Sequence, residues 1–181
     1  MTLPLNTAPG PSPDEEAERH AEISRDFLAK ARAELESGDL LQASEKAWGA
    51  AAHAIKAVAE RRRWFSEADW KLRRAAEIIT AELGDENILR CFSLSRDAHY
   101  NFYHHLFDSQ GVGSAVAAAS DLVAMLDRTL APDYTPPIVN EVTENKIRSL
   151  EQPTSDPDRD RLQNGRPPME HRPPAVPPAT P

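Results

Sequence analysis

Three histidines stand close together in the sequence, beside an arginine and two tyrosines. Arg96, Tyr100 and His104 follow one another at intervals of four residues, so a helix places them along one strip of its surface, with His99 and His105 flanking it. Metal-independent cleavage of RNA needs a group that takes the 2′-hydroxyl proton and a cation that stabilises the phosphate charge, which suits histidine and arginine. Arg96, His99 and His104 are therefore candidate catalytic residues. A solvated helix face and a contact between subunits are the alternative interpretations.

His99 also falls within an apolar stripe that ends at Leu106, and a histidine in such a stripe is usually a core residue bonded to a carboxylate or a hydroxyl. Three histidines without a nearby acidic cluster make a poor zinc site. The single cysteine, Cys91, excludes an internal disulfide and a cysteine-based metal centre, and its apolar surroundings predict a buried structural thiol. The sequence therefore predicts no metal site and no cofactor.

A second candidate surface is the segment 61–74, which combines six basic with three aromatic residues. Basic groups beside aromatic rings can hold phosphates and stack bases. The candidate RNA- or phosphate-binding residues are Arg61, Arg62, Arg63, Lys71, Arg73 and Arg74. In the structural alternative, Trp64, Phe65 and Trp70 close one end of a bundle while the arginines stabilise a helix C-terminus. RNA binding would depend on such a local patch, because a formal charge of -8 repels nucleic acid overall.

The distribution of proline defines the part of the chain that positions these groups. Four of the 16 prolines precede residue 14 and twelve follow residue 130, so the stretch between them has none. Because proline disrupts helix interiors, we expect a flexible segment over 1–13, a helical domain over 14–131 and a Pro-rich, largely disordered tail over 132–181. A chain of 181 residues with this pattern excludes a two-domain enzyme and a large α/β fold.

Caps and apolar periodicity predict five helices in the proline-free region. They are expected over residues 12–38, 39–62, 66–84, 85–107 and 114–131. The first begins with the capping box of Ser12 and Glu15, and Gly38 and Gly84 are suited to helix ends. The second is rich in small residues that allow close approach, so we expect it at the centre. Long amphipathic helices joined by short loops predict an all-α, up-and-down bundle of four to five helices.

Within the expected tail, Ile138, Val142, Ile147 and Leu150 have the spacing of a weak amphipathic helix over 138–150. Such a helix either docks on a surface or forms transiently within a disordered tail, and the sequence leaves both alternatives open. The paired prolines are also typical of ligands for aromatic grooves.

Neither membrane insertion nor secretion is predicted. No run of about eighteen apolar residues is present, which is the length that a spanning helix needs. The first residues lack the basic flank and continuous apolar stretch of a secretory signal. We therefore expect a cytoplasmic protein.

Two stretches resemble the HEPN superfamily, in particular its small PaREP-type branch. Residues 38–57, GDLLQASEKAWGAAAHAIKA, are similar to the second helix of that branch, where Gly-Asp, alanine, Glu-Lys, paired alanines and Ile/Val-Lys-Ala recur. Residues 99–103, HYNFY, resemble a later helix with a histidine, an asparagine and an aromatic pair in this order. The resemblance covers about residues 20–130. Tetratricopeptide repeats also contain alanine-rich helices that begin with Gly-Asp, but no second copy occurs at an offset of about 34 residues.

The resemblance implies an all-α bundle that forms a homodimer and, in active members, a metal-independent ribonuclease site across the dimer. In those members an arginine, commonly followed by a polar residue, precedes a histidine by four to six intervening positions. Arg96 and Asp97 match the first half of this pattern. The permitted positions hold no histidine, because His104 lies one position too far and His99 lies too near. This departure counts against nuclease activity and leaves the fold unaffected.

The sequence therefore favours a non-catalytic, dimeric, HEPN-like interaction module that binds a protein or RNA partner. Its expected mechanism is burial of an apolar helix face against a second copy. Two alternatives are a divergent metal-independent endoribonuclease, with Arg96 acting beside His104 or His99, and an accessory subunit of a nucleotidyltransferase-type partner. All three predict the same fold.

Overall fold

The computed structural model describes residues 10–64, 66, 68–137 and 141–151. In this part of the chain every regular element is helical. The elements are α1 (Pro13–Ser37), α2 (Leu40–Arg61), α3 (Asp69–Leu83), α4 (Asn87–His104), α5 (Ser109–Asp127), the 3-10 turn η1 (Arg128–Leu130) and α6 (Glu141–Leu150). The predicted all-α fold is confirmed. Most of the expected flexible segment 1–13 and residues 152–181 of the expected tail lie outside the described residues.

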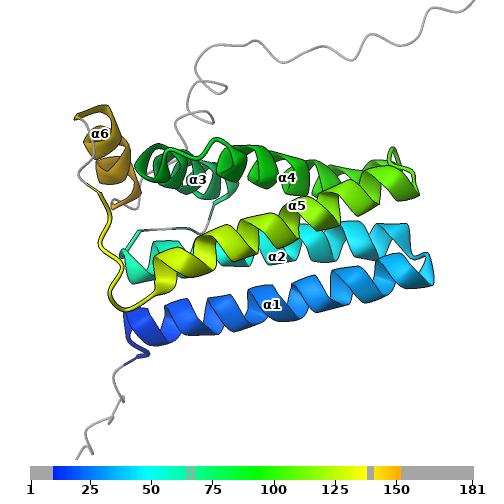
Figure 1. The fold of residues 1–181 in the computed structure, drawn as a ribbon, viewed down its shortest axis with the longest axis horizontal. Helices are drawn as coiled ribbons and strands as arrows, with labels where there is room; N and C mark the ends of the chain where they lie inside the picture. Colours follow the sequence, from blue (N-terminus) through cyan, green and yellow to red (C-terminus); the bar gives the residue numbers. More distant parts are fainter. Residues whose placement is uncertain (1–9, 65, 67, 138–140, 152–181) are drawn as a thin grey trace, which may run out of the picture.

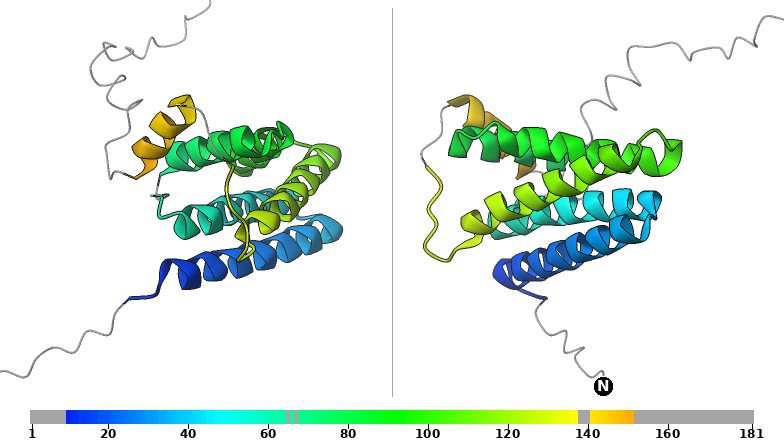
Figure 2. Two further views of the ribbon diagram at one scale, coloured as in Figure 1. Left: turned by 60° about the vertical axis from the view of Figure 1, so that its left-hand side comes forward. Right: turned by 45° about the vertical axis from the view of Figure 1, so that its right-hand side comes forward.

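The four long helices α1, α2, α4 and α5 lie side by side and alternate in direction (Figure 1). Helix α2 packs against α1, α4 and α5, and its alanines at 47, 50, 51 and 54 are buried. The predicted central position of this helix is therefore confirmed. The short helix α3 lies at one end of the bundle and joins α2 to α4, and both views in Figure 2 place α6 beside that end.

The predicted starts of α1 and α2 and the predicted stops at Gly38 and Gly84 are correct. The Ser12 hydroxyl accepts a hydrogen bond from the Glu15 amide at 3.2 Å, and the Glu15 carboxylate accepts one from the Ser12 amide at 2.6 Å. Gly38 and Gly84 adopt left-handed conformations with φ of 87° and 62°, which glycine adopts without strain. The Asp39 carboxylate then caps α2 by accepting the Gln42 amide at 3.0 Å.

Several other helix boundaries differ from the predictions. Helix α4 stops at His104, before the expected residue 107, because His105 adopts a left-handed φ of 54° and donates its amide to the Asn101 carbonyl. Helix α5 begins at Ser109, before the expected residue 114, because the Asp108 carboxylate caps it. Helix α3 begins only after Ala68, and no side chain caps it.

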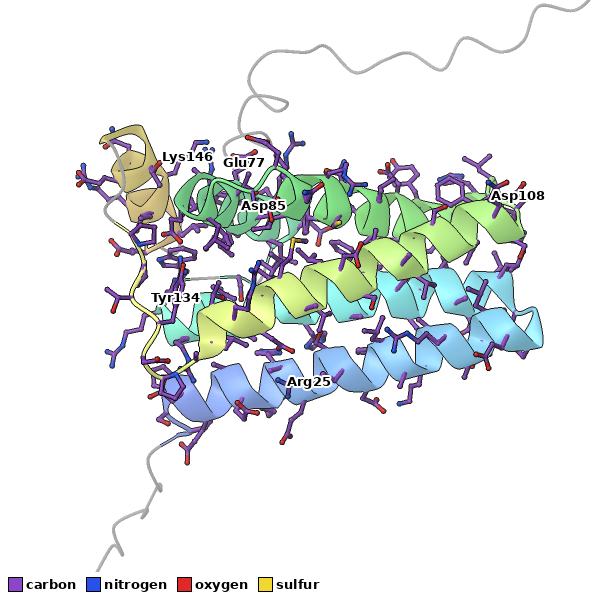
Figure 3. All side chains as sticks on the ribbon, viewed as in Figure 1. Arg25, Glu77, Asp85, Asp108, Tyr134 and Lys146 are labelled. Atoms are coloured by element: carbon purple, nitrogen blue, oxygen red, sulfur yellow. The ribbon has the colours of Figure 1, made fainter. Side chains whose placement is uncertain are left out.

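Two contacts fix how the helices approach one another. A Cβ atom at Gly49 in α2 would lie 3.1 Å from the Phe27 ring of α1, so the absence of a side chain permits this close approach. On α6, Leu150 is fully buried and Lys146 lies 3.6 Å from Glu77 of α3, which places α6 against α3 (Figure 3). No helix in the described residues has the length and hydropathy required to cross a membrane.

Candidate functional site

The most organised group of polar side chains that the sequence singled out lies between α2 and α4. His99 Nδ1 and Glu45 Oε2 are 2.8 Å apart, and both side chains are about one-third exposed, at 31% and 33%. The imidazole also lies between Trp48 of α2 and Tyr103 of α4, with ring centroids at 5.8 and 5.2 Å. Of the two partners expected for His99, a carboxylate or a hydroxyl, the structure has the carboxylate. The imidazole is partly exposed, however, and is not the core residue that was expected.

The other two candidate catalytic residues are not joined to this pair. Arg96 lies one turn before His99 on α4, and its guanidinium is 3.9 Å from the Asp97 carboxylate in an exposed ion pair. His104 is exposed in the last turn and stacks on Tyr100, with ring centroids 5.2 Å apart. A separation of eight residues places Arg96 and His104 about 12 Å apart along the helix axis. Along the helix, Arg96 is therefore closer to His99 than to His104.

Asn101 holds a structural position that its sequence context did not reveal. It is 1% exposed, donates to the Ser44 hydroxyl of α2 at 2.9 Å and accepts the Phe107 amide at 2.6 Å. These bonds tie the end of α4 and the following loop to α2. The asparagine within the family-like HYNFY stretch therefore positions the C-terminal end of α4.

Large exposed hydrophobic residues gather at that same end. In the part of the chain that the structure describes, they are Tyr100 at 64%, Tyr103 at 64% and Leu106 at 72% exposure. We call these three residues the α4 patch. Leu106 was expected within the apolar stripe of the fourth helix, but the earlier end of α4 leaves it in the loop and in solvent. Apolar side chains that cluster in this way are typical of interaction surfaces.

Most of the basic groups of segment 61–74 form contacts within the protein. Arg62 pairs with Glu82 in a buried salt bridge, and Arg61 lies 3.8 Å from Asp14. Arg73 and Arg74 both approach Glu77, at 3.3 and 3.7 Å, and Lys71 is 5% exposed. Arg63 is exposed. Phosphate binding by these six residues stays a prediction. A phosphate would have to compete with the carboxylates that already pair with several of them.

Of the aromatic residues in this segment, Trp64 fits the structural alternative, whereas Trp70 is only partly buried. Trp64 is 5% exposed, and the Arg62 guanidinium lies 4.9 Å from its ring centroid. Tyr134, from the segment after η1, lies 5.9 Å from the same guanidinium. Phe65 lies outside the described residues. Trp64 is therefore part of the closed end of the bundle rather than an exposed platform for bases.

Cys91 is 1% exposed on α4, and burial raises the pKa of its thiol. A raised pKa disfavours the reactive thiolate. This agrees with the expected structural thiol. Among the described residues, no three histidine, cysteine, aspartate or glutamate side chains gather into a group that could hold a metal ion.

The fold defines a class of protein, the up-and-down bundle of four long helices with a short helix between the second and third. Within it, the pattern of the archaeal PaREP1/PaREP8 family matches residues 19–123, and the chain belongs to this family. The PaREP-type part of the resemblance is therefore confirmed.

A solved structure supports the same fold. The crystal structure of a Sulfolobus solfataricus protein is similar with a TM-score of 0.51 and 22% identity, over 60% of this chain and 97% of that one. At this identity the likeness concerns the fold alone. No curated protein matches the sequence.

Proposed function

We propose that this protein is a non-catalytic interaction module of HEPN type, which forms a homodimer through the α4 patch and binds a protein or RNA partner. The exposure of Tyr100, Tyr103 and Leu106 is the observation that carries this proposal. Tyrosine provides a large contact area at a low cost in conformational entropy, and is enriched among residues that dominate binding energy. A twofold axis brings the patch of one copy against that of the other.

The magnitudes favour a weak dimer. Burial of the exposed part of a large apolar side chain stabilises by roughly 1 to 2 kcal/mol, so the six side chains of two patches supply about 10 kcal/mol. Association costs about 4 to 15 kcal/mol in lost translational and rotational freedom. The lowest of these costs leaves about 6 kcal/mol, which corresponds to a dissociation constant of tens of micromolar. The remaining surface is free for the partner, which in one version of this proposal is a nucleotidyltransferase-type protein.

Light scattering of the full chain tests the dimer. We expect dimers to dominate at about 100 μM and above, and a monomer for the double variant Tyr103→Glu, Leu106→Glu, because carboxylates in the interface repel one another. Ala81→Glu, which adds a charge at an exposed position of α3, is the matched control and should leave the dimer intact. A monomeric wild-type protein, or dimers unaffected by the double variant, would contradict the proposal.

A second candidate function is metal-independent RNA cleavage, because His99 is oriented by Glu45 at 2.8 Å. A carboxylate that orients an imidazole is the arrangement of a general base, and Arg96 one turn away supplies a cation for the phosphate. The test is incubation of mixed RNA with the protein in excess chelator, alongside Arg96→Ala, His99→Ala and His104→Ala variants. Cleavage that these substitutions abolish would replace the non-catalytic assignment, whereas intact RNA with intact dimers supports it.

A further inference from the structure

An open groove of about 580 Å³ lies where the turn between α1 and α2 meets the turn between α4 and α5. Its apolar lining consists of Leu40, Leu41 and Phe107, whose side chains are only partly buried. His105 also lines the groove and, like Phe107, is a direct neighbour of Leu106 in the chain, so the groove borders the α4 patch. An exposed apolar groove of this kind is typical of a site that binds another apolar segment.

The border of this groove is acidic. The segments 36–41 and 105–108, which contain all its lining residues, include Glu36, Asp39 and Asp108 but no lysine or arginine. All three carboxylates are exposed, and none forms a salt bridge within the part of the chain that the structure describes. Asp39 and Asp108 cap α2 and α5 through one oxygen each, at 3.0 and 2.8 Å from a backbone amide. The caps fix these two carboxylates, and the second oxygen of each can accept a hydrogen bond from a cation.

A segment with complementary chemistry occurs in the same chain, among residues 152–181, which lie outside the described residues. The sequence Arg-Pro-Pro occurs there twice, at 166–168 and 172–174. Proline has a fixed φ and restricts the residue before it to extended conformations, so a peptide with this sequence favours polyproline II. In that helix residues three apart share an edge, which puts Arg166 and Arg172 on one edge and the four prolines on the other two. The segment 166–174 thus combines cationic and apolar edges, with two arginines against one glutamate.

This segment is long enough to reach the groove. Figure 3 places Lys146 of α6 and Asp108 at opposite ends of the bundle, and the 22 residues of α2 span about 33 Å along it. Arg166 follows Glu151 by 15 positions, and an extended chain of that length spans up to about 50 Å. Such a tether gives a local concentration of about a millimolar, so even a weak contact is populated.

We propose that the groove is a recognition site for Arg-Pro-Pro sequences and that residues 166–174 of the same chain occupy it. The proline edges rest on Leu40, Leu41 and Phe107, and the arginines pair with the carboxylates of the border. Proline loses little conformational entropy on binding, because its φ is already fixed. The site lies beside Leu106 but does not depend on the dimer proposed above.

Paramagnetic relaxation in the full chain tests where this segment lies. A spin label on Ala175→Cys, next to the second Arg-Pro-Pro, should broaden the amide signals of residues 37–41 and 105–107 more than those of residues 20–26 in α1. Because Cys91 is buried, the unsubstituted chain treated with the same reagent is the labelling control. Broadening confined to α3 and α6, or equal broadening on every helix, would overturn the proposal.

Substitutions in the tail test the arginines. The variant Arg166→Gln, Arg172→Gln should reduce the broadening at the groove by roughly threefold or more, because two ion pairs are lost. The matched control is Arg159→Gln, Arg161→Gln, which removes the same charge from a part of the tail where no proline follows an arginine. Equal effects of the two double variants would show that the tail is attracted by charge alone, and would overturn recognition of Arg-Pro-Pro.

Substitutions at the border test the carboxylates. The variant Asp39→Asn, Asp108→Asn removes two charges and keeps both helix caps, because asparagine is as good a capping residue as aspartate. It should also reduce the broadening at the groove, whereas Glu18→Gln, at an exposed position of α1, should not. Unchanged broadening in the aspartate variant would show that the arginines do not pair at this border.

A mixed sample distinguishes the same chain from a second copy as the occupant. Spin-labelled chains without isotope are mixed with isotope-labelled chains without the spin label, at about 10 μM, where the proposed dimer is mostly dissociated. We expect no broadening at the groove in this sample. Broadening as strong as in the single labelled chain would assign the groove to the tail of another copy and overturn the proposal. A failure of the dimer in light scattering leaves all these outcomes unaffected.

Discussion

The Nδ1 atoms of His20 on α1 and His53 on α2 lie 2.8 Å apart. One ring must donate and the other must accept at this distance, so the contact requires at least one neutral imidazole. Burial lowers the pKa of both residues, and lowers that of His53 to about 4, with further contributions from the positive charges of His20, Lys56 and Arg19. The Glu16 carboxylate opposes the shift at His20. Nothing in the sequence spacing joins these two residues, which lie on separate helices.

This histidine pair makes the stability of the protein depend on pH. The pKa of His53 falls from an ordinary 6.5 to about 4 on folding, so the unfolded chain binds more protons between these values. The stabilisation is fully present above pH 6.5 and is lost as the pH falls toward 4. We expect the midpoint of urea unfolding to fall over this window in the wild type and to fall less in His53→Asn, whose side chain does not titrate.

The control for this pH dependence is His104→Asn, which removes an exposed histidine whose ring stacks on Tyr100. Both variants keep every carboxylate, so acid effects from aspartate and glutamate are common to all three proteins. If His53→Asn shows the same pH profile as the wild type, the histidine pair does not contribute to the pH dependence of stability.

The buried pair of Arg62 and Glu82 gives a second prediction. Their side chains are 11% and 3% exposed, and removal of one partner from a buried ion pair typically costs about 3 kcal/mol or more. Glu82→Gln should therefore lower the free energy of unfolding by about 3 kcal/mol in chemical denaturation. Asp26→Asn, which breaks the exposed pair with Lys30, should cost less than about 1 kcal/mol. Equal small losses would mean that water screens the guanidinium of Arg62.

The contact between Gly49 and Phe27 gives a third prediction. Gly→Ala in a helix interior gains about 1 kcal/mol in helix propensity, but the new methyl group would lie 3.1 Å from the Phe27 ring. We expect Gly49→Ala to destabilise the wild type, because displacement of a packed ring costs about 1 to 3 kcal/mol. In a Phe27→Ala background the same substitution should stabilise by the propensity gain. If the effect of Gly49→Ala on the free energy of unfolding has the same sign in both backgrounds, this explanation is wrong.

Sequence periodicity and capping were sufficient for the helical part of the fold. Ser12, Gly38 and Gly84 act through bonds and dihedral angles within a few residues, so their roles follow from local sequence. His105 ends α4 in a left-handed conformation, which a histidine in the sequence does not predict. Because α4 ends there, Leu106 lies in solvent and not in the expected apolar stripe.

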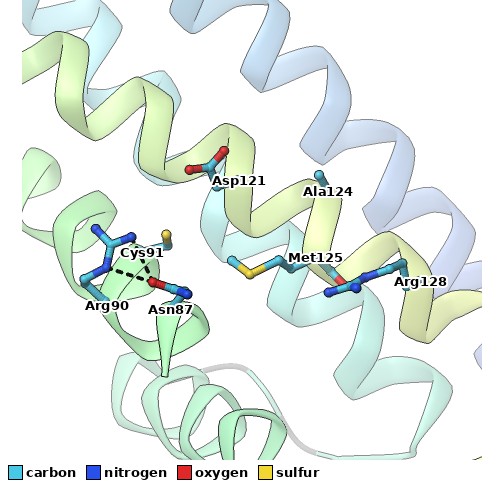
Figure 4. A pocket seen from close by; sticks show the side chains of 7 residues that line it. All are labelled: Asn87, Arg90, Cys91, Asp121, Ala124, Met125 and Arg128. Carbon is cyan, nitrogen blue, oxygen red and sulfur yellow. Dashed lines mark hydrogen bonds between the residues drawn. The ribbon is translucent and has the colours of Figure 1, made fainter. Parts of the chain in front are cut away.

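The candidate site was less accessible to sequence analysis, because its contacts join residues far apart in the chain. Glu45 and His99 are separated by 54 positions, and the sequence predicted a carboxylate or a hydroxyl as the partner of His99 without identifying the residue. A cleft between α4 and α5 has the same origin, since Arg90 and Arg128 line its opposite sides only when these helices pack (Figure 4). Local patterns therefore specified the helices, and tertiary packing specified which polar groups face one another.

The fourth prediction concerns the buried amide of Asn101, which is bonded to the Ser44 hydroxyl and the Phe107 amide. Asn101→Ala leaves both groups without this partner in a buried setting, and each unsatisfied group costs about 1 to 3 kcal/mol. We expect a loss of about 3 kcal/mol in the free energy of unfolding, against about 1 kcal/mol for Ser44→Ala, which removes only one of the two bonds.

The same substitution links stability to the proposed interaction surface. Asn101 ties the loop that carries Leu106 to α2, so its loss should release residues 105–107 and speed their amide hydrogen exchange while α1 stays protected. Because the α4 patch then loses its fixed shape, we expect a larger dimer dissociation constant for Asn101→Ala than for Ser44→Ala. Unchanged exchange at Phe107 together with unchanged dimer affinity would show that the loop is held by contacts other than this amide.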